Sequence, residues 1–389
     1  MESLKCGILR TGIGELSLNN VLQCGQAFRW VYNSKNLQYS TTMKVGDTYK
    51  VVILQQPDET TIKFTGLGLE GSDLTPLKDH LHDYFRLDLS LIQMHSEDWL
   101  TRDSSFQTKS PRGVRLLNQE PWETLVSFIC SSNNNIYRIT KMCHNLCEHF
   151  GNKVGTLDGI DYYSFPTSEE LCSRASEDKL RTLGFGYRAK YIIGTAAKMA
   201  SDKQNLSETE YLSNLKDHLT YEQIREQFMS YPGVGPKVAD CACLMGMKMD
   251  DVVPVDVHIA RIAQRDYRFT PNKASLKELQ EKYKDLPITR KKVNYELDLI
   301  RIMFKEKWGD YAGWAQCVLF AQEMGKIAGA TTEGLVSKRK VKSEYEIEIK
   351  GEDLEVKLED VEETVTEKIE YSITGRPRRR ATKKVKYEF

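Results

Sequence analysis

Between two stretches of helical periodicity the chain reads Tyr231-Pro232-Gly233-Val234-Gly235-Pro236-Lys237. Two glycines around one apolar residue permit a tight turn with positive φ, so this stretch predicts a hairpin between two helices. We expect the second helix to begin at about Lys237, where free backbone N–H groups and the helix dipole favour an anion such as a phosphate. A Gly-x-Gly turn alone is weak evidence, so its meaning depends on the sequence around it.

A second turn, Val253-Pro254-Val255-Asp256-Val257-His258, follows the hairpin and opens another helical stretch. Asp256 stands where it would cap that helix, and capping could be its whole role. In the other reading, its carboxylate faces Lys237. A lysine that is partly desolvated at a helix N-terminus has a lowered pKa and can act as an amine nucleophile. Single lysines are mostly solvated, but the hairpin, the lysine and the Pro-x-Asp turn together favour the nucleophile.

Strand-like and helical patterns occupy different parts of the chain. Residues 37–45, 49–54 and 60–67 are β-rich runs separated by turn residues, and we expect them to pair as an antiparallel meander. From Pro121 onward the period becomes helical, with an apolar stripe along residues 136–150. Further helical stretches are expected at about 169–183, 188–201, 222–230, 237–248, 256–265, 275–284 and 310–326. The predicted fold class is α+β, with an N-terminal antiparallel sheet domain over residues 1–115 and a mainly α-helical body over residues 116–330.

Composition excludes several classes of protein. The 389 residues carry 55 Lys and Arg against 55 Asp and Glu, so net charge argues neither for nor against an anionic partner. Because there is no apolar run of about 18 residues and no apolar leader, we expect neither a membrane span nor secretion. Nine cysteines without framework spacing are typical of a reducing compartment.

The last 59 residues, 331–389, separate their charges. Residues 344–370 hold twelve acidic and three basic side chains, and residues 376–386 hold seven basic and no acidic ones. Apolar residues are too sparse to form a core, so we expect a disordered tail. Its basic clusters resemble nuclear-import signals, and Thr374-Gly375-Arg376-Pro377-Arg378 is similar to an AT-hook core, although a merely solvated end is the alternative. We expect a nuclear protein, and a mitochondrial pool stays open.

The hairpin, Lys237 and Asp256 resemble the helix–hairpin–helix, Gly-Pro-Asp superfamily of DNA glycosylases. Four further segments make the resemblance closer to the eukaryotic 8-oxoguanine DNA glycosylases, and the match spans about residues 16–325. They are Ser127-Phe128-Ile129-Cys130-Ser131-Ser132-Asn133-Asn134-Asn135-Ile136, Gly184-Phe185-Gly186-Tyr187-Arg188-Ala189, Val253–His258 with Ile262-Ala263-Gln264-Arg265-Asp266-Tyr267, and Tyr311-Ala312-Gly313-Trp314-Ala315-Gln316.

The resemblance implies a bifunctional DNA glycosylase and AP lyase that extrudes the damaged base from the duplex. Lys237 would attack C1′, displace the base and form a Schiff base with the opened sugar, and β-elimination would then nick the strand. Asp256 would stabilise the developing positive charge on the sugar and help to transfer protons.

The resemblance also assigns the base pocket. Cys241 and Phe320 would sandwich the damaged guanine, and Gln316 would hydrogen-bond its Watson–Crick edge. The backbone carbonyl of Gly25 would accept the N7–H that 8-oxoguanine has and guanine lacks. One unpaired buried contact of that kind costs about 1–3 kcal/mol, which biases selection without accounting for all of it.

The remaining implied contacts are to DNA. Asn133 would fill the vacated stack, Arg138 and Arg188 would donate to the orphaned cytosine, and Tyr187 would wedge the duplex. The backbone amides of Gly233, Gly235 and Lys237, together with His258, would hold the phosphates near the lesion.

Cofactors are expected to be unnecessary. Some relatives bind an iron–sulfur cluster through four C-terminal cysteines, but here only Cys317 lies beyond residue 243, so no cluster and no metal site are expected. Hairpin carbonyls coordinate a cation in this superfamily, which leaves a structural cation open. Glu323 stands where the family often carries an Asp, so its contact to the base is in doubt.

The expected partner is damaged double-stranded DNA with 8-oxoguanine opposite cytosine, bound by a monomer. Two alternatives remain. The same fold could act on another lesion, such as an alkylated or mismatched purine, although Lys237 argues against a purely monofunctional relative. The chain could instead be a non-catalytic DNA-structure-binding protein that kept only the hairpin, against which Lys237, Asp256 and the pocket set all argue.

Overall fold

The computed structural model describes residues 6–67, 69 and 73–327. The predicted tail of residues 331–389, with its basic clusters and AT-hook-like segment, lies outside these described residues. Residues 1–260 and 271–324 form one compact unit, which holds every candidate site residue, and residues 261–270 and 325–327 belong to a second. The exact limits of the sheet domain, 1–115, and of the helical body remain a prediction.

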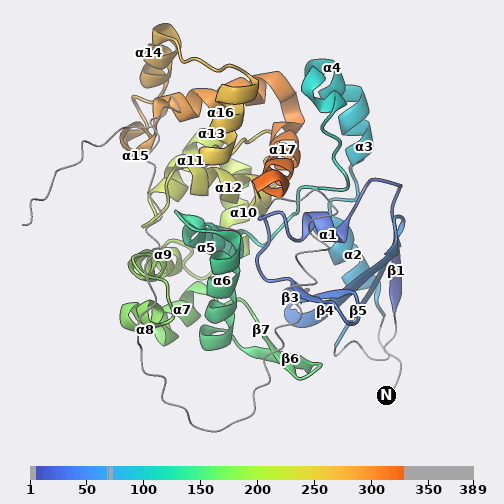
Figure 1. Cartoon of the computed structure of the whole chain (residues 1–389). Helices are drawn as coiled ribbons and strands as arrows, with labels where there is room; N and C mark the ends of the chain where they lie inside the picture. Colours follow the sequence, from blue (N-terminus) through green and yellow to red (C-terminus); the bar gives the residue numbers. More distant parts are fainter. Residues whose placement is uncertain (1–5, 68, 70–72, 328–389) are drawn as a thin grey trace, which may run out of the picture. The chain divides into compact units, whose positions relative to one another are not determined.

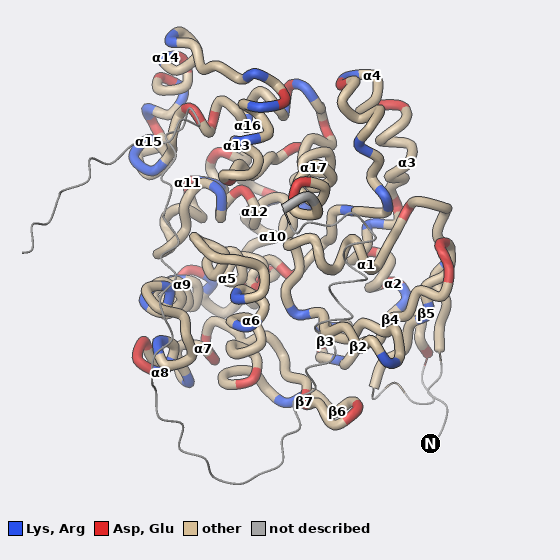
Figure 2. The backbone as a smooth tube through the Cα atoms, viewed as in Figure 1, with Lys and Arg blue, Asp and Glu red and all other residues tan. Residues whose placement is uncertain are grey.

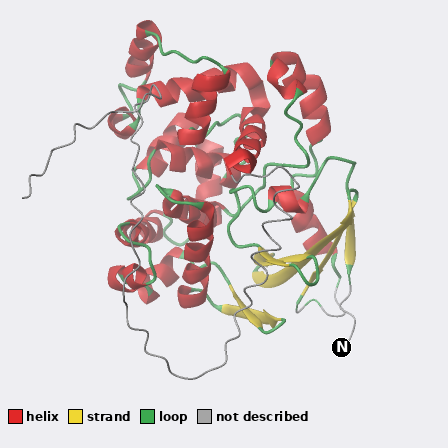
Figure 3. Ribbon diagram, viewed as in Figure 1, coloured by secondary structure: helices red, strands yellow, loops and turns green. Residues whose placement is uncertain are grey.

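A five-stranded antiparallel sheet forms the first part of the chain (Figures 1 and 3). Its order is β1-β5-β4-β3-β2, with strands Gly7–Arg10, Val31–Asn33, Gln38–Val45, Thr48–Asp58 and Thr61–Gly66 as β1 to β5. Gly46 has a φ of +61° in the turn between β3 and β4, a conformation that glycine adopts without strain. The predicted meander is confirmed, and the short strands β1 and β2, which the sequence analysis did not include, pair along its two edges.

One face of the sheet packs on helices α1 (Leu18–Val21) and α2 (Thr75–Tyr84). Val52, Leu54 and Ile62 are completely buried in this core, together with Leu81 of α2. Short helical segments follow before the main helical part: α3 (Leu91–Gln93), a π-helical turn (Met94–Trp99), α4 (Leu100–Arg102) and a 3₁₀ turn (Ser104–Gln107).

The rest of the described chain is mainly helical, as predicted, but its elements differ from the predicted ones in three ways. The stretch expected at 169–183 is two helices, because the first ends at Arg174 with an extended Ala175, and Ser176 caps the second. A β-hairpin was missed at β6 (Lys153–Leu157) and β7 (Ile160–Tyr163), as were α10, α15 and α16. The helices are α5 (Pro121–Ser131), α6 (Ile136–Phe150), α7 (Ser168–Arg174), α8 (Glu177–Thr182), α9 (Arg188–Asp202), α10 (Glu208–His218), α11 (Tyr221–Met229), α12 (Pro236–Gly246), α13 (Val257–Asp266), α14 (Lys273–Lys282), α15 (Pro287–Lys292), α16 (Tyr295–Trp308) and α17 (Ala312–Ile327).

Helices α5 and α12 pack against each other and form the centre of the helical part. Every residue of α12 from Val238 to Gly246 is buried, and α5 is buried over most of its length. A β-carbon on Gly246 would lie 2.8 Å from the Cα of Pro121, so the helices approach closely where α12 ends. This packing fixes α12, and with it the helix start that carries Lys237.

A buried ionic network holds α12 from its other side. Arg225 of α11 pairs with Asp240 of α12 at 2.8 Å and with Asp298 of α16 at 2.7 Å, and Arg301 pairs with Asp298 at 3.0 Å. Burial alone would raise the pKa of Asp298, but Arg225 and Arg301 hold it well below its usual range. Two buried positive and two buried negative charges therefore compensate one another, whereas charges of both signs are scattered over the rest of the described backbone (Figure 2).

No helix in the described ranges is both long and apolar enough to span a bilayer. Nor do three or more His, Cys, Asp or Glu side chains of the described residues gather into a group that could hold a metal ion.

Candidate active site

Lys237 is the second residue of α12, so it lies at the positive end of that helix. Gly235 occupies the N-cap position without a side-chain cap, and Pro236 begins the helix. The Lys237 ammonium lies 4.6 Å from the centre of the Phe128 ring and donates to Ser131 Oγ at 3.3 Å. Two residues of α5 thus hold the amine at the helix start.

The predicted hairpin is present and is held tightly in place. Gly233 has a φ of +76°, and a β-carbon there would lie 2.5 Å from Cβ of Tyr191, so only glycine fits. Gly235 is extended, with open space where a side chain would stand. Thr195 Oγ1 donates to the carbonyl of Pro232 at 2.7 Å, which ties the turn to α9.

Cys241 lies one helical turn after Lys237 and is 2% exposed. Burial raises the pKa of its thiol to about 12, while Lys237 acts in the opposite direction, so the thiol is neutral near pH 7. Lys237 and Asp256 both act electrostatically on this thiol, which indicates that α12 and the start of α13 bring the two around Cys241.

Asp256 caps α13. Its Oδ1 accepts hydrogen bonds from the backbone N–H groups of His258 at 2.9 Å and Ile259 at 3.0 Å. The expected capping role is therefore confirmed, and it fixes the carboxylate at the helix start.

Four predicted residues assemble on one side of this centre. Gly25 has a φ of +90°, and a β-carbon there would lie 3.1 Å from Ile136 and 3.6 Å from Phe320. The Phe320 ring stands edge-on to His258, with centroids 5.8 Å apart. Gln316, one turn before Phe320 on α17, is 5% exposed. Gly25 and His258 are therefore both close neighbours of Phe320.

His258 contributes a buried ring nitrogen. Its Nδ1 has no hydrogen-bond partner among the residues described. A buried nitrogen of this kind is available to a ligand, and a phosphate oxygen is one acceptor that it could meet.

The loop of residues 132–135 is held by two side chains from the start of α9. Tyr187 donates its hydroxyl to the carbonyl of Ser132 at 3.0 Å, and Arg188 donates to the carbonyls of Ser132 and, at 3.0 Å, Asn133. Arg188 is only 4% exposed and stacks on Tyr187, with its guanidinium carbon 4.5 Å from the ring centre. Its Nε and Nη2 donors are therefore engaged by loop carbonyls, whereas Nη1 has only a long contact to the carbonyl of Phe185, at 3.5 Å.

The three consecutive asparagines have different tasks. Asn133 is exposed and has a φ of +47°, a strained conformation that asparagine tolerates better than most residues. Asn134 donates to the carbonyl of Cys130, and Asn135 caps α6 by accepting from the backbone N–H of Arg138 at 3.0 Å. Only Asn135 of the three caps this helix, and the Arg138 side chain is exposed in the first turn of α6.

Some residues of this site were not selected from the sequence. Phe128 and Ser131 contact Lys237, and both lie in the segment Ser127–Ile136 that carries part of the family resemblance. The helical pattern that begins at Pro121 was the available sequence signal for these two residues. Ile136 lies against Gly25, and Tyr191 lies under the hairpin, but neither contact is visible in the sequence. Glu323 is 5% exposed, so it is a buried acid of α17.

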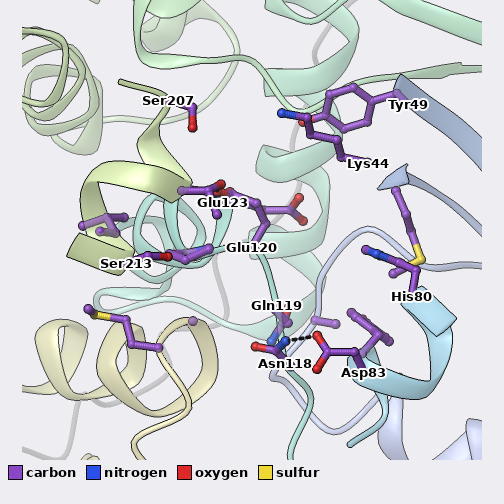
Figure 4. Close-up of a pocket in the computed structure, with 18 of the residues that line it drawn as sticks. Lys44, Tyr49, His80, Asp83, Asn118, Gln119, Glu120, Glu123, Ser207 and Ser213 are labelled. Carbon is purple, nitrogen blue, oxygen red and sulfur yellow. Dashed lines mark hydrogen bonds between the residues drawn. The ribbon is translucent and has the colours of Figure 1, made fainter. Parts of the chain in front are cut away.

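A separate cavity of about 790 Å³ lies where the sheet meets α2, α5 and α10, and it contains none of the predicted site residues (Figure 4). Glu120 caps α5 by accepting from the backbone N–H of Glu123 at 2.6 Å, and it also accepts from Thr209 at 3.0 Å. Burial raises the pKa of Glu120 to about 7. Glu123 pairs with Arg29 at 2.6 Å. These polar groups are satisfied by one another, which is typical of a structural junction.

Comparison with known proteins agrees with this geometry. Residues 8–125 match the model of the 8-oxoguanine DNA glycosylase N-terminal domain, and residues 126–286 match that of the HhH-GPD superfamily of base excision DNA repair proteins. The chain is 55% identical over 368 residues to an N-glycosylase/DNA lyase of Saccharomyces cerevisiae, covering 92% of this chain and 98% of that protein. It is 33% identical over 315 residues to an N-glycosylase/DNA lyase of Arabidopsis thaliana, covering 80% and 78%.

A solved structure gives the same result. The 8-oxoguanine glycosylase/lyase of Clostridium acetobutylicum, in complex with double-stranded DNA containing cytosine opposite 8-oxoguanine, superposes with a TM-score of 0.65 at 26% identity. The match covers 85% of this chain and 99% of that one. The chain therefore belongs to the 8-oxoguanine DNA glycosylase family of N-glycosylase/DNA lyases, within the HhH-GPD superfamily.

Proposed function

We propose that this protein excises 8-oxoguanine paired with cytosine from duplex DNA and then nicks the strand through a Schiff base on Lys237. The observation that carries the proposal is the position of the Lys237 amine. It lies at the positive end of α12, over Phe128, one turn from buried Cys241. The yeast and plant relatives, which are named N-glycosylase/DNA lyases, support the pair of activities.

Lys237 has to lose a proton before it can attack. The proton leaves through the hydrogen bond to Ser131 or to solvent. The neutral amine attacks C1′, the glycosidic bond breaks with its electron pair, and the departing base takes up a proton.

The covalent adduct then explains the nick. The sugar ring opens to an iminium ion on Lys237, a base removes the C2′ proton, and the 3′ phosphate leaves by β-elimination. Water finally hydrolyses the imine and frees the amine. Asp256, fixed at the start of α13, stabilises the positive charge that develops on the sugar and relays protons between these steps.

Recognition of the lesion follows from the pocket around Gly25. Gly25 carries no side chain that would take up space beside Phe320, and the flat base stacks between Phe320 and Cys241. The Gly25 carbonyl accepts the N7–H of 8-oxoguanine, and Gln316 bonds its Watson–Crick edge. Guanine presents an acceptor at N7, so the same carbonyl repels it.

The strand opposite the lesion meets the loop of residues 132–135. Asn133 enters the vacated stack, and Arg138 and Arg188 donate to the acceptors of cytosine. Because Arg188 and Tyr187 hold the loop carbonyls in the free protein, binding exchanges these bonds for bonds to DNA. Gly233, Gly235 and His258 hold the phosphates of the lesion strand. We propose that the enzyme acts as a monomer in the nucleus.

Borohydride trapping tests the proposal. The purified full chain is incubated with borohydride and a duplex that contains one 8-oxoguanine opposite cytosine, beside Lys237→Gln and a matched control, Lys277→Gln, on the exposed side of α14. Wild type and the control should form a covalent adduct, and Lys237→Gln should form none.

Two substitute duplexes distinguish the alternatives. An adduct that forms only on a pre-made abasic site would retain the lyase and assign the glycosylase to another lesion. Equal rates opposite cytosine and adenine would contradict the proposed reading of the opposite base. If DNA is bound but no adduct forms on any duplex, the lysine mechanism is wrong.

A further inference from the structure

One ammonium group contacts the hairpin backbone between α11 and α12. Lys292 Nζ donates to the carbonyl of Met229 at 2.6 Å and to the carbonyl of Val234 at 3.2 Å. Met229 is the last residue of α11, and Val234 lies between the two hairpin glycines. Two carbonyls from the two ends of the turn therefore converge on a single positive charge.

The position of Lys292 is set by a second group of hydrogen bonds. Lys292 is the last residue of α15. Glu226 of α11 accepts from the backbone N–H groups of Ile288 at 2.8 Å and Thr289 at 2.7 Å, and from the Thr289 hydroxyl at 2.6 Å. These bonds dock the start of α15 on α11, so that the end of α15 delivers its lysine to the hairpin.

The Lys292 ammonium already occupies the position between the two carbonyls. A metal ion bound there would have to displace the ammonium, and it would then lie next to a positive charge. Partial burial lowers the pKa of Lys292, Glu226 raises it, and neighbouring Lys291 lowers it. The two carbonyls oppose this lowering, because an ammonium group donates stronger hydrogen bonds to them than a neutral amine would.

We infer that Lys292 is the built-in cation of the hairpin: its ammonium group does the work of a bound metal ion and holds the turn of Gly233 and Gly235 in shape for a DNA phosphate. The inference rests on the proposed function, because it concerns the phosphate grip of that same site. Lys292 is a positioning residue, which acts on DNA through the hairpin backbone.

The wild-type protein alone provides the first test. Affinity for a duplex with a tetrahydrofuran abasic analogue, which cannot be cleaved, is measured by fluorescence anisotropy at one ionic strength. Three buffers are compared. The first contains EDTA and tetramethylammonium, a cation that is too large to enter the turn; the second contains K⁺; the third contains K⁺ and Mg²⁺. Wild-type affinity should agree within about twofold in all three, since ionic strength sets the general electrostatic part of binding. A tenfold loss in tetramethylammonium that K⁺ restores would overturn the inference.

Substitution of Lys292 provides the second test. Lys292→Met keeps the length of the side chain and removes the charge, and Lys291→Met is the matched control with the same change in net charge one residue away. Lys292→Met should bind roughly tenfold more weakly than Lys291→Met in tetramethylammonium. It should regain part of the loss in K⁺ or Mg²⁺, because small cations can then enter between the carbonyls. Equal affinities of the two variants in every buffer would also overturn the inference.

Two further variants keep the test decisive if Lys292→Met fails to fold. Lys292→Arg retains the charge and should bind DNA without added small cations, whereas Glu226→Gln loosens α15 and should acquire part of the cation dependence. All of these measurements use DNA that cannot react. Failure of the proposed excision would therefore appear only in the borohydride assay with wild type, and failure of the inference only in the affinities.

Discussion

The two regions proposed to face the DNA are built in opposite ways. The centre around Lys237 stands on α12, which is buried from Val238 onward and braced by the ionic network of Arg225 and Asp240. None of the residues 132–135 in the loop is buried, and Asn133 is strained. Its shape depends on two side chains of α9 that are themselves proposed to contact DNA.

This difference shows which parts of the candidate site are already ordered in the free protein. The amine, the capped Asp256 and the neutral Cys241 are fixed by packing, so the reaction centre needs little rearrangement. Under the proposed function, the loop exchanges bonds of Arg188 and Tyr187 for bonds to DNA. The proposal thus couples reading of the opposite base, but not the reaction itself, to a conformational change.

Removing the acid from the ordered region should have the largest effect. Asparagine caps helices as well as aspartate does, so Asp256→Asn should keep the α13 start intact while losing charge stabilisation of the sugar. We expect the excision rate under single-turnover conditions to fall by about 10²–10⁴-fold. Thermal melting serves as the control, and a large drop in Tm would mean that the rate reports damage to the helix instead.

Breaking the ionic network should weaken the support of that region. Asp240→Asn leaves Arg225 buried with less compensation, and the loss of a partner in a buried pair costs about 3–5 kcal/mol in free energy of unfolding. The control is Asp251→Asn, which breaks the more exposed pair with Lys305 and should cost about 0–1 kcal/mol. Urea denaturation measures both, and similar losses for the two variants would contradict the assigned importance of the network.

The flexible region should respond in specificity more than in stability. Arg188→Ala removes the guanidinium that holds the loop in the free protein and is proposed to contact cytosine. The preference in excision rate for cytosine over adenine should fall roughly tenfold, in the range of one lost base contact. Arg181→Ala, an exposed arginine of α8 paired only with Glu177, provides the control. An unchanged preference would remove Arg188 from the reading of the opposite base.

The smallest expected effect concerns the cavity near Glu120, which lies outside both regions. A carboxyl whose pKa is raised to about 7 in the folded protein binds more protons there than in the unfolded chain, so its contribution to stability is lost as pH rises from about 4.5 to 7. Glu120→Gln should flatten this part of the stability profile by about 1–2 kcal/mol. Urea midpoints at pH 5 and pH 7.5 measure it, and parallel profiles of wild type and variant would argue against the raised pKa.

Local signals accounted for much of the fold. Pro121 and the apolar stripe of α6 predicted helices, and the alternation around Ile62 predicted a strand, because these patterns depend on neighbours in sequence. The β6–β7 hairpin was missed because it is a short two-stranded ribbon between long helices. The short helix α15 was missed because its start is held by Glu226, a residue 62 positions away from Ile288 in the chain.

The candidate site shows the same contrast between local sequence signals and contacts of residues far apart in the chain. The residue types at the hairpin and at Asp256 indicate their chemistry, so Lys237 and the cap could be predicted. The contact of Lys237 with Ser131 spans 106 positions, and that of Lys292 with Val234 spans 58. Such pairs are produced by packing, and a single sequence carries no local pattern for them.

The close approach of Gly246 to Pro121 fixes how near α5 and α12 lie to each other. Since α5 and α12 run in opposite directions, the start of α5 meets the end of α12, while Ser131 at the other end of α5 meets Lys237. The absence of a side chain at residue 246 thus allows close packing at one end of the helix pair, and the nucleophile lies at the other end. Substituting Gly246 with residues of increasing size would push the two helices apart by increasing amounts. The position of the Lys237 amine could be adjusted in this way without altering any group that touches the substrate.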